Sequence, residues 1–421
     1  MSTHPGPRRI ITIASAKGGV GKTTLAINYG LALSDYGKTV LFDFDFETGS
    51  VRSFLDMDFD RDLYHFLRKG DSLESCVVPL PKRLDPQQRY PNFGVIASPR
   101  HFMEEWTRVK RPTQHRLAGA IHRLPVDYVI LDMKAGLSDE IIDAMPYSNS
   151  GILIFTPRLL AATSAAAYLV KAQLFRKLQV MFSPHSPIVE GLSYLQVSEI
   201  QALLHRADDV YDREIQNLDT VFDILQKKFG EHPVVTAMAR TLGTFQVHYV
   251  LNHFTGVEES YQKAVKPFVE ALTEIVSSRL KVRNLGWVQY HESIHDANCR
   301  RVPVMLGGGV SRQAAEAAKQ REVLLELAEL ADAPRLGRRP GPAKKPALDR
   351  YLAEQLGQLE ATYGRMKNRS IPEDFDYIAA ASIHLMQAER PYHFGDVRIL
   401  DAADLQRMIL DFHRQGAAQG S

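Results

Sequence analysis

The sequence is poor in cysteine and carries little net charge. Only Cys76 and Cys299 occur among 421 residues, and their separation matches no metal-binding spacing. Two distant thiols favour a reducing compartment and argue against a zinc or iron–sulfur site within one subunit, so we expect each to be a small buried side chain. The net charge of +2 gives the whole molecule no strong attraction to nucleic acid or acidic partners.

Long apolar runs and a leader segment are also missing. No window reaches the roughly 18 apolar residues that a membrane span requires, and residues 1–9 are short and polar, unlike a secretory leader. We therefore expect a cytoplasmic protein. A hydrophobic fraction of 45% and a charged fraction of 24% are typical of a globular chain, whose length allows more than one structural unit.

Short apolar runs alternate with helical patterns through the first 180 residues. Runs that predict buried strands are residues 10–14, 39–44, 92–97, 128–131 and 151–155. Helical patterns separate them, notably around residues 113–123 and 161–178. This alternation predicts an α/β fold with a doubly wound, mostly parallel sheet that is covered by helices on both faces.

The second half of the chain changes character several times. Residues from about 183 to 240 are charged and helix-like, with helical patterns at 197–205, 210–229 and 233–239, which predicts a helical insertion. Strands at 245–252 and 284–288 and a closing helix at 316–331 follow. Residues 332–346 hold four prolines, two glycines and five basic residues, as in an exposed linker. We expect a main domain over 1–331, this linker, and a small helical appendage over 347–421, with Ser370 and Asp401 as helix caps.

Residues 17–24 read KGGVGKTT between a predicted strand and a predicted helix. The three glycines let backbone N–H groups converge on phosphate oxygens, and the helix directs its positive end at the same anion. Lys22 can reach the β- and γ-phosphates and the Thr23 hydroxyl can ligate Mg²⁺. The expected nucleotide-binding residues of this loop are Gly18, Gly19, Val20, Gly21, Lys22, Thr23 and Thr24.

A second lysine narrows the class of nucleotide-binding protein that the loop indicates. Lys17 opens the loop five residues before Lys22, and in this form, KGGxGK[ST], the loop resembles that of the MinD/ParA family of deviant Walker A ATPases. The resemblance implies a P-loop NTPase fold of the SIMIBI type, ATP with Mg²⁺ as cofactors, and an ATP-bound homodimer in which Lys17 reaches the partner's nucleotide. Such a lysine would couple hydrolysis to assembly, as an arginine finger does.

Two strands end in carboxylates. Residues 40–45, VLFDFD, place Asp43 and Asp45 on one side, at the strand end where ligands bind in such sheets. By resemblance Asp45 orients the attacking water and Asp43 supports the Mg²⁺ or the loop. Asp132 ends the run YVILD as a Walker B aspartate does, holding Mg²⁺ through water. The candidate catalytic residues are Lys17, Lys22 and Asp45, and the candidate metal-site residues are Thr23, Asp132 and Asp43.

Residues 133–136, MKAG, resemble the family's switch segment. Lys134 replaces the usual Pro or Gly, which leaves the backbone geometry of the switch and the hydrolysis rate open, although no phosphate or metal ligand is lost. Asn252 ends the run VLN and matches the strand-end asparagine that contacts adenine, since an amide can both donate and accept.

Residues 285–304 resemble the family segment LGxIPxDxxVxxAxxxGxPV, which borders the base. His291 occupies the usual acidic position, Gln289 replaces the Pro, and Arg301 stands where Gly is common. The details of DFDFETGS, NFGVIAS and DMKAGLSDEIID are closer to the MinD and FlhG branch than to plasmid ParA.

The resemblance implies a dimerising switch ATPase that positions or partitions a cellular cargo and is stimulated by an activating or cargo protein. Two alternatives stay open. One is a maturation or metabolic enzyme of the same superfamily, although the Cys-x-x-Cys pair common in cofactor inserters is absent. The other is a slowly hydrolysing adaptor that ATP locks as a dimer, for which Lys134 is the only indication.

The sequence also leaves open the matrix, a membrane surface or DNA, on which such a switch would act. The predicted last helix, 402–414, has an apolar face but mixed charges opposite, so packing on the appendage is favoured over a membrane surface. The basic stretch 335–345 and the group Arg279, Lys281 and Arg283 could bind DNA without sequence preference. A solvated linker is the simpler interpretation of that stretch.

Overall fold

The computed structural model describes residues 9–46, 49–100, 111–137, 149–184, 186–209, 211–307, 345–386, 392–394 and 397–399. The strands of its main sheet are β1 (Arg9–Ala14), β2 (Thr39–Phe44), β3 (Val78–Pro79), β4 (Phe93–Ile96), β5 (Tyr128–Met133), β6 (Asn149–Phe155), β7 (Gln246–Phe254) and β8 (Lys281–Gln289). Their order is β3-β4-β2-β5-β1-β6-β7-β8. All neighbours are parallel except β3 and β4, which confirms the predicted fold class.

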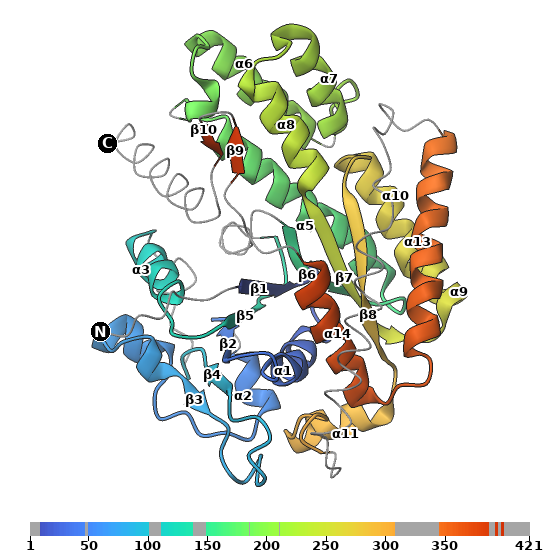
Figure 1. The fold of residues 1–421 in the computed structure, drawn as a ribbon. Helices are drawn as coiled ribbons and strands as arrows, with labels where there is room; N and C mark the ends of the chain where they lie inside the picture. Colours follow the sequence, from blue (N-terminus) through green and yellow to red (C-terminus); the bar gives the residue numbers. More distant parts are fainter. Residues whose placement is uncertain are drawn as a thin grey trace.

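The central strands are buried on both faces. Every residue of β5 and β6 is buried, because helices cover the parallel sheet on either side (Figure 1). The strand that the sequence did not predict is β3, two residues long, antiparallel and at the sheet edge. Its Pro79 is tolerated there because an edge strand does not need every backbone N–H for the ladder.

The helices that flank the sheet are α1 (Lys22–Leu33), α2 (Ser50–Phe54), α3 (Arg111–Ile121), α5 (Leu160–Met181), α9 (Val257–Ser260), α10 (Lys266–Ile275) and α11 (Glu292–Arg300). Helix α1 is buried from Thr23 to Leu33, so the residues that follow the glycine-rich loop are held rigidly. Within the part of the chain that the structure describes, no helix is long and apolar enough to cross a membrane.

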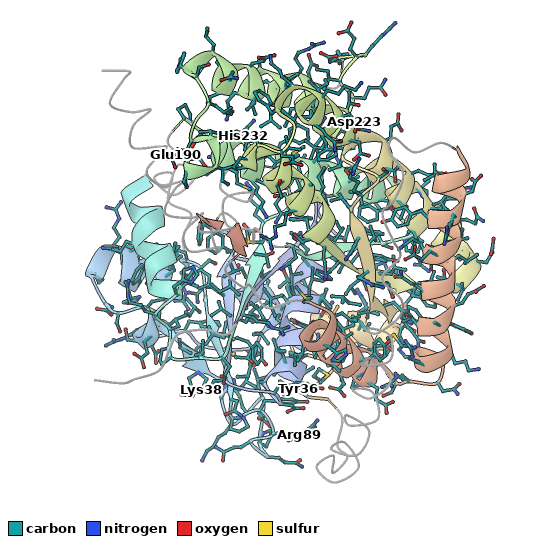
Figure 2. All side chains as sticks on the ribbon, turned by 45° about the horizontal axis from the view of Figure 1, so that its top comes forward. Tyr36, Lys38, Arg89, Glu190, Asp223 and His232 are labelled. Atoms are coloured by element: carbon teal, nitrogen blue, oxygen red, sulfur yellow. The ribbon has the colours of Figure 1, made fainter. Side chains whose placement is uncertain are left out.

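The predicted insertion is helical. It comprises α6 (Tyr194–Asp208), α7 (Leu218–Phe229) and α8 (Pro233–Thr244), at the top of Figure 1. The sequence predicted a helix from residue 210, but α7 begins at Leu218 because Asn217 Oδ1 accepts the first free N–H groups of the helix. His232 caps α8 in the same way and its other ring nitrogen meets the carbonyl of Glu190 (Figure 2).

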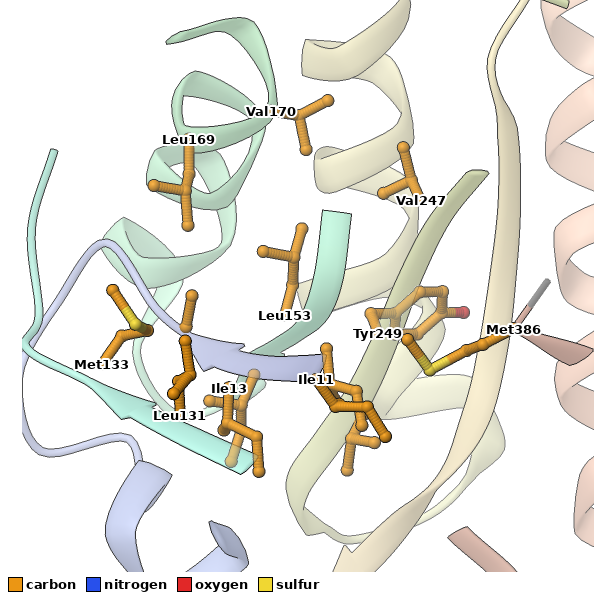
Figure 3. Close-up of a cluster of buried hydrophobic side chains, with 14 of the residues drawn as sticks. Ile11, Ile13, Leu131, Met133, Leu153, Leu169, Val170, Val247, Tyr249 and Met386 are labelled. Atoms are coloured by element: carbon orange, nitrogen blue, oxygen red, sulfur yellow. The ribbon is translucent and has the colours of Figure 1, made fainter. Parts of the chain in front are cut away.

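The C-terminal part packs on the main sheet. Helices α13 (Lys345–Met366) and α14 (Ile371–Leu385) join the hydrophobic core of the P-loop region; the Tyr29 hydroxyl of α1 lies 2.8 Å from Ser382 Oγ of α14. Figure 3 shows Met386, just after α14, beside Ile11 and Tyr249 of the sheet. Residues 345–386 therefore share one core with the main domain.

The prediction of a wholly helical appendage is wrong at two short segments. Residues Tyr392–Phe394 (β9) and Val397–Ile399 (β10) form an antiparallel pair, in keeping with their aromatic and β-branched residues. The predicted closing helix 316–331, residues 332–344 of the predicted linker and the predicted helix 402–414 lie outside the described residues. One cysteine also differs from expectation: Cys76 is buried, whereas Cys299 is exposed on α11.

Candidate nucleotide site

The glycine-rich loop joins β1 to α1. Gly19 has φ +76° and Gly21 has φ +91°, in the region that side-chain-bearing residues rarely adopt. Gly21 is the N-cap of α1 and supplies no capping side chain, so the first N–H groups of the helix are available to an anion. The loop thus has the conformation that the motif predicts for a phosphate site.

Three side-chain oxygens lie close together at the N-terminal end of α1. Thr23 Oγ1 donates to Asp132 Oδ2 at 2.7 Å and lies 3.0 Å from Ser50 Oγ, and Ser50 Oγ lies 3.4 Å from the same Asp132 oxygen. Two hydroxyls and a carboxylate are oxygen donors of the kind that Mg²⁺ prefers, so these residues fit the metal. The sequence predicted Thr23 and Asp132 as metal-site residues. Ser50 ends the run DFDFETGS but was not predicted to bind the metal.

Asp132 is buried at the end of β5, with 1% of its surface exposed. Burial raises its pKa to about 6, although the hydrogen bond from Thr23 and the charge of Lys22 oppose the rise. Its second oxygen, Oδ1, has no hydrogen-bond partner among the described residues. A buried carboxylate oxygen without a donor is costly, and a bound cation would supply the missing interaction.

Lys22 and Asp45 share the electrostatic field of this cluster. Burial lowers the pKa of Lys22, against the attraction of Asp132 and Asp45. Asp45 follows β2, and its backbone N–H donates to Asp43 Oδ1 at 3.2 Å. The structure therefore brings the loop lysine and two of the predicted carboxylates together, at the end of the sheet where ligands bind.

Asp43 is fully buried opposite Asp132 in the β2–β5 register. Burial, with the nearby Asp132, raises the pKa of Asp43 to about 7. Its Oδ2 accepts from Ser98 Oγ at 2.9 Å and from the N–H of Val51 at 3.3 Å. These contacts brace the segment after β2, and the predicted support of the Mg²⁺ or of the phosphate loop stays a prediction.

The switch segment touches the start of the loop. The N–H of Gly136 donates to the carbonyl of Ser15 at 3.1 Å, and Ser15 Oγ donates to the carbonyl of Lys17 at 2.7 Å. Lys17 itself is exposed, and Lys134 is half-buried. A movement of the switch segment would therefore shift the backbone of Lys17 through Ser15.

Asn252 contacts the loop directly. Its Nδ2 donates to the carbonyl of Val20 at 2.8 Å, so this amide braces the phosphate loop, while its role toward adenine stays a prediction. A further asparagine that the sequence did not reveal, Asn298 of α11, donates to Thr24 Oγ1 at 3.2 Å. Two amides from distant parts of the chain thus hold the loop and the start of α1.

The backbone conformation at Arg301 explains why glycine is common at this position in the family. It ends α11 with φ +57°, a left-handed conformation that glycine adopts most easily. Its guanidinium compensates by donating to the carbonyls of Arg52 at 2.7 Å and Leu55 at 2.9 Å. The segment predicted to border the base is thereby tied to α2, which carries Ser50.

A second group at this edge was not predicted. Arg158, His253 and Tyr290 lie at the ends of β6, β7 and β8. The guanidinium carbon of Arg158 lies 3.7 Å from the centre of the Tyr290 ring, which His253 meets edge-on at 5.5 Å. Burial and then the charge of Arg158 lower the pKa of His253. These contacts are between strands, so no local pattern could reveal them.

One predicted surface cluster is smaller than expected. Arg279 Nε lies 3.3 Å from Asp219 Oδ1, and its guanidinium stacks over the Phe222 ring at 4.4 Å. This pairing withdraws Arg279 from the basic group that was predicted to be available to DNA. Lys281 remains exposed at the start of β8.

Comparison with known proteins agrees with this geometry. Residues 8–180 match a family model described as an AAA domain. The putative septum site-determining protein MinD of Chlorella vulgaris is 25% identical over 203 residues, 47% of this chain and 70% of that protein. The septum site-determining protein MinD of Synechocystis sp. is 28% identical over 203 residues, 47% of this chain and 72% of that protein.

Among solved structures, septum site-determining protein MinD complexed with Mg-ADP from Pyrococcus horikoshii OT3 is similar at 15% identity and a TM-score of 0.43, covering 78% of this chain and 99% of that chain. The family model covers the part of the chain that carries KGGVGKTT and YVILD. Together with the MinD relatives, it confirms the resemblance that these motifs indicated.

Proposed function

We propose that this chain, which is a P-loop ATPase of the MinD and ParA type, is a switch that binds ATP with Mg²⁺, dimerises through the bound nucleotide and thereby positions or partitions a cellular cargo. Its output would be assembly, with hydrolysis as the step that ends it. We also propose that a partner protein stimulates hydrolysis. The dimer, this partner and the cargo all go beyond membership of the family.

The proposal rests on exposed apolar side chains that follow three strands of the sheet, on the face that carries the loop. Leu137 follows β5 and is 46% exposed, Leu159 and Leu160 follow β6 and are 39% and 58% exposed, and Tyr290 follows β8 and is 55% exposed. In a parallel sheet these strand ends share one edge with the glycine-rich loop. Apolar side chains gathered in this way are typical of a protein interface.

A second copy of the chain is the occupant that this face fits best. Lys17 is exposed at the same edge, where its ammonium could reach a nucleotide bound to another molecule. A cation supplied across an interface stabilises charge on the transferring phosphate only in the assembled state. Hydrolysis would then depend on dimerisation.

Within one subunit we assign the roles from the motifs, and the contacts are compatible with them. Lys22 and the N–H groups at the start of α1 hold the phosphates, and Thr23 with Asp132 holds the cation, which when bound neutralises phosphate charge. Asp45 orients the attacking water. Asp43 acts through Ser98 and the segment after β2.

Co-sedimentation of the full chain with liposomes of anionic lipid, or with DNA, tests the positioning function. We expect ATP-dependent recruitment to one matrix, none with ADP, and stronger recruitment of Asp45→Ala because its dimer persists. Lys17→Ala is the control that should bind ATP and fail to assemble. Recruitment to neither matrix by wild type and Asp45→Ala would contradict the positioning function.

One observation favours the slowly hydrolysing adaptor as a second candidate. Lys134 stands where the switch segment of the family has Pro or Gly, next to the residues that lead to Gly136 and the loop. ATP-dependent dimerisation of wild type with a hydrolysis rate no higher than that of Asp45→Ala would support this candidate over the hydrolysing switch.

A further inference from the structure

Ser50 joins the predicted metal-site residues although the sequence did not assign it to the metal. It is the first residue of α2, whereas Thr23 is the second residue of α1 and Asp132 lies near the end of β5. Their oxygens are 3.0 Å apart for Thr23 and Ser50, 2.7 Å for Thr23 and Asp132, and 3.4 Å for Ser50 and Asp132. Three separate elements therefore bring one oxygen each to a common point.

The spacing of these oxygens suits a small divalent cation. Mg²⁺ binds six oxygens octahedrally at about 2.0–2.1 Å, which places adjacent ligand oxygens about 2.9 Å apart. The three measured distances lie on either side of that value. A cation held by these three oxygens would take its remaining ligands from phosphate oxygens and water.

A second observation points to a ligand at this place. Asp132 is buried, yet its Oδ1 has no hydrogen-bond partner among the described residues. Of the two carboxylate oxygens of Asp132, only Oδ2 lies near the hydroxyl groups of Thr23 and Ser50. The cluster therefore has more acceptor capacity than its donors satisfy, which a cation or its bound water would relieve.

We propose that the Ser50 hydroxyl is a further oxygen donor to the divalent cation, either directly or through one bound water, beside Thr23 and Asp132. The inference rests on the proposed Mg²⁺–ATP function and adds a residue to that site. It also has a structural consequence, because the neighbouring N–H of Val51 donates to Asp43. Cation binding at Ser50 would fix α2, and with it the segment that begins at Asp45.

The first test measures the cation itself. Fluorescence of an ATP analogue bound to the full chain is titrated with Mg²⁺ for wild type, Ser50→Ala, Ser50→Thr and Ser53→Ala. Ser53 is the matched control because it is an exposed serine of the same helix. We expect Ser50→Ala to raise the dissociation constant for Mg²⁺ by about tenfold or more, and the other two variants to remain close to wild type.

The second test uses metal preference. Sulfur is a soft ligand that binds Cd²⁺ well and Mg²⁺ poorly, so Ser50→Cys should lose Mg²⁺ affinity and regain nucleotide binding with Cd²⁺. Ser53→Cys should show neither effect. Melting temperatures in the presence of a chelator show that the variants are folded.

The outcomes distinguish a failure of the role of Ser50 from a failure of the proposed Mg²⁺–ATP function. If Ser50 only steadies Asp132 in the ligand-free protein, Ser50→Ala will lower the melting temperature in chelator and leave the dissociation constant for Mg²⁺ at the wild-type value, which overturns the inference alone. If wild type itself binds the ATP analogue without any dependence on Mg²⁺, the proposed Mg²⁺–ATP function is overturned, and the role of Ser50 with it.

Discussion

The backbone of Gly21 lies so close to the side chain of Asn252 that a Cβ atom on Gly21 would stand 2.3 Å from Asn252 Nδ2. The same amide nitrogen donates to the carbonyl of Val20. The phosphate loop and the end of β7 therefore pack as one unit, and the glycine is required by this neighbour as well as by its φ of +91°.

Substitution of Gly21 by alanine should destabilise the protein before any nucleotide is added. The new Cβ must displace Asn252, and a left-handed alanine stores strain of about 1–3 kcal/mol. We expect a melting temperature lower by at least about 3 °C and an ATP affinity lower by about tenfold. Gly18→Ala is the control, since nothing lies within 4 Å of its Cβ position. Equal melting temperatures for the two variants would contradict this account.

Lys17 should matter only when two molecules meet. If its ammonium acts on the partner's nucleotide, the wild-type ATPase rate per subunit rises with protein concentration, and Lys17→Ala removes this rise and lowers the maximal rate by about a hundredfold. Binding of ATP to one subunit should change little. Lys38→Ala is the matched control, because Lys38 is exposed just before β2, at the other end of the strand from Asp43. A rate per subunit that never changes with concentration would argue against action across an interface.

Much of the fold and the centre of the site could be predicted because their signals are local. The run KGGVGKTT specifies a loop conformation and its ligand within eight residues, and YVILD delivers Asp132 by the geometry of a single strand. The contacts of Ser50 and Asn298 could not be found in this way. Both residues lie in segments that resemble the family, DFDFETGS and residues 285–304, but neither stands at a position that those motifs specify. Each contacts α1 from a segment distant in sequence, and a serine or an asparagine alone does not distinguish such a contact from a surface position.

The surface on which the C-terminal helices pack could not be predicted for the same reason. Apolar residues at helical spacing predicted α13 and α14, but periodicity does not reveal which surface an amphipathic helix covers. In the structure, α14 packs on α1 and the sheet. The Tyr29 hydroxyl lies beside Ser382 Oγ, and Met386 lies in the buried cluster of Figure 3. The helix start at Leu218 was missed because the cap at Asn217 competes with the helical pattern before it.

Gly286 offers a test of whether α13 and α14 belong to the main core. It lies in β8 with φ +121°, and a Cβ there would approach Tyr377 at 3.1 Å and Met366 at 3.2 Å. Gly286→Ala should therefore lower the melting temperature by several degrees, through strain and displacement of α14. Gly357→Ala, on the exposed side of α13 with open space around it, should be neutral or stabilising by up to about 1 kcal/mol. Unfolding in two separate transitions would contradict a shared core.

The stability of this junction should also depend on pH through Asp374. This carboxyl group is buried near the start of α14, and its Oδ2 accepts the N–H of Gln289 at 3.2 Å. Burial raises the pKa of Asp374 to about 8, while the N–H of Gln289 and the charge of Arg369 oppose the rise. The folded protein therefore holds this proton at neutral pH, whereas the unfolded chain releases it near pH 4.

The direction of the pH effect follows from that difference. A raised pKa in the folded state contributes stability that is fully present below about pH 4 and is lost progressively as the pH rises to about 8. Asp374→Asn resembles the protonated carboxyl group in shape and cannot ionise, so it escapes this loss. We expect the melting temperature of Asp374→Asn minus that of wild type to increase by several degrees between pH 5 and pH 8.5.

Taking this difference isolates Asp374 from the other buried carboxyl groups. Asp43 and Asp132 also have raised pKa values, but they are present in both proteins and their contributions cancel. Asp349→Asn, an exposed position on α13, should give a difference that does not change with pH. Parallel curves for Asp374→Asn and wild type would mean that α14 opens enough at Gln289 to hydrate the carboxylate, and that the C-terminal helix is held to the sheet by its apolar contacts alone.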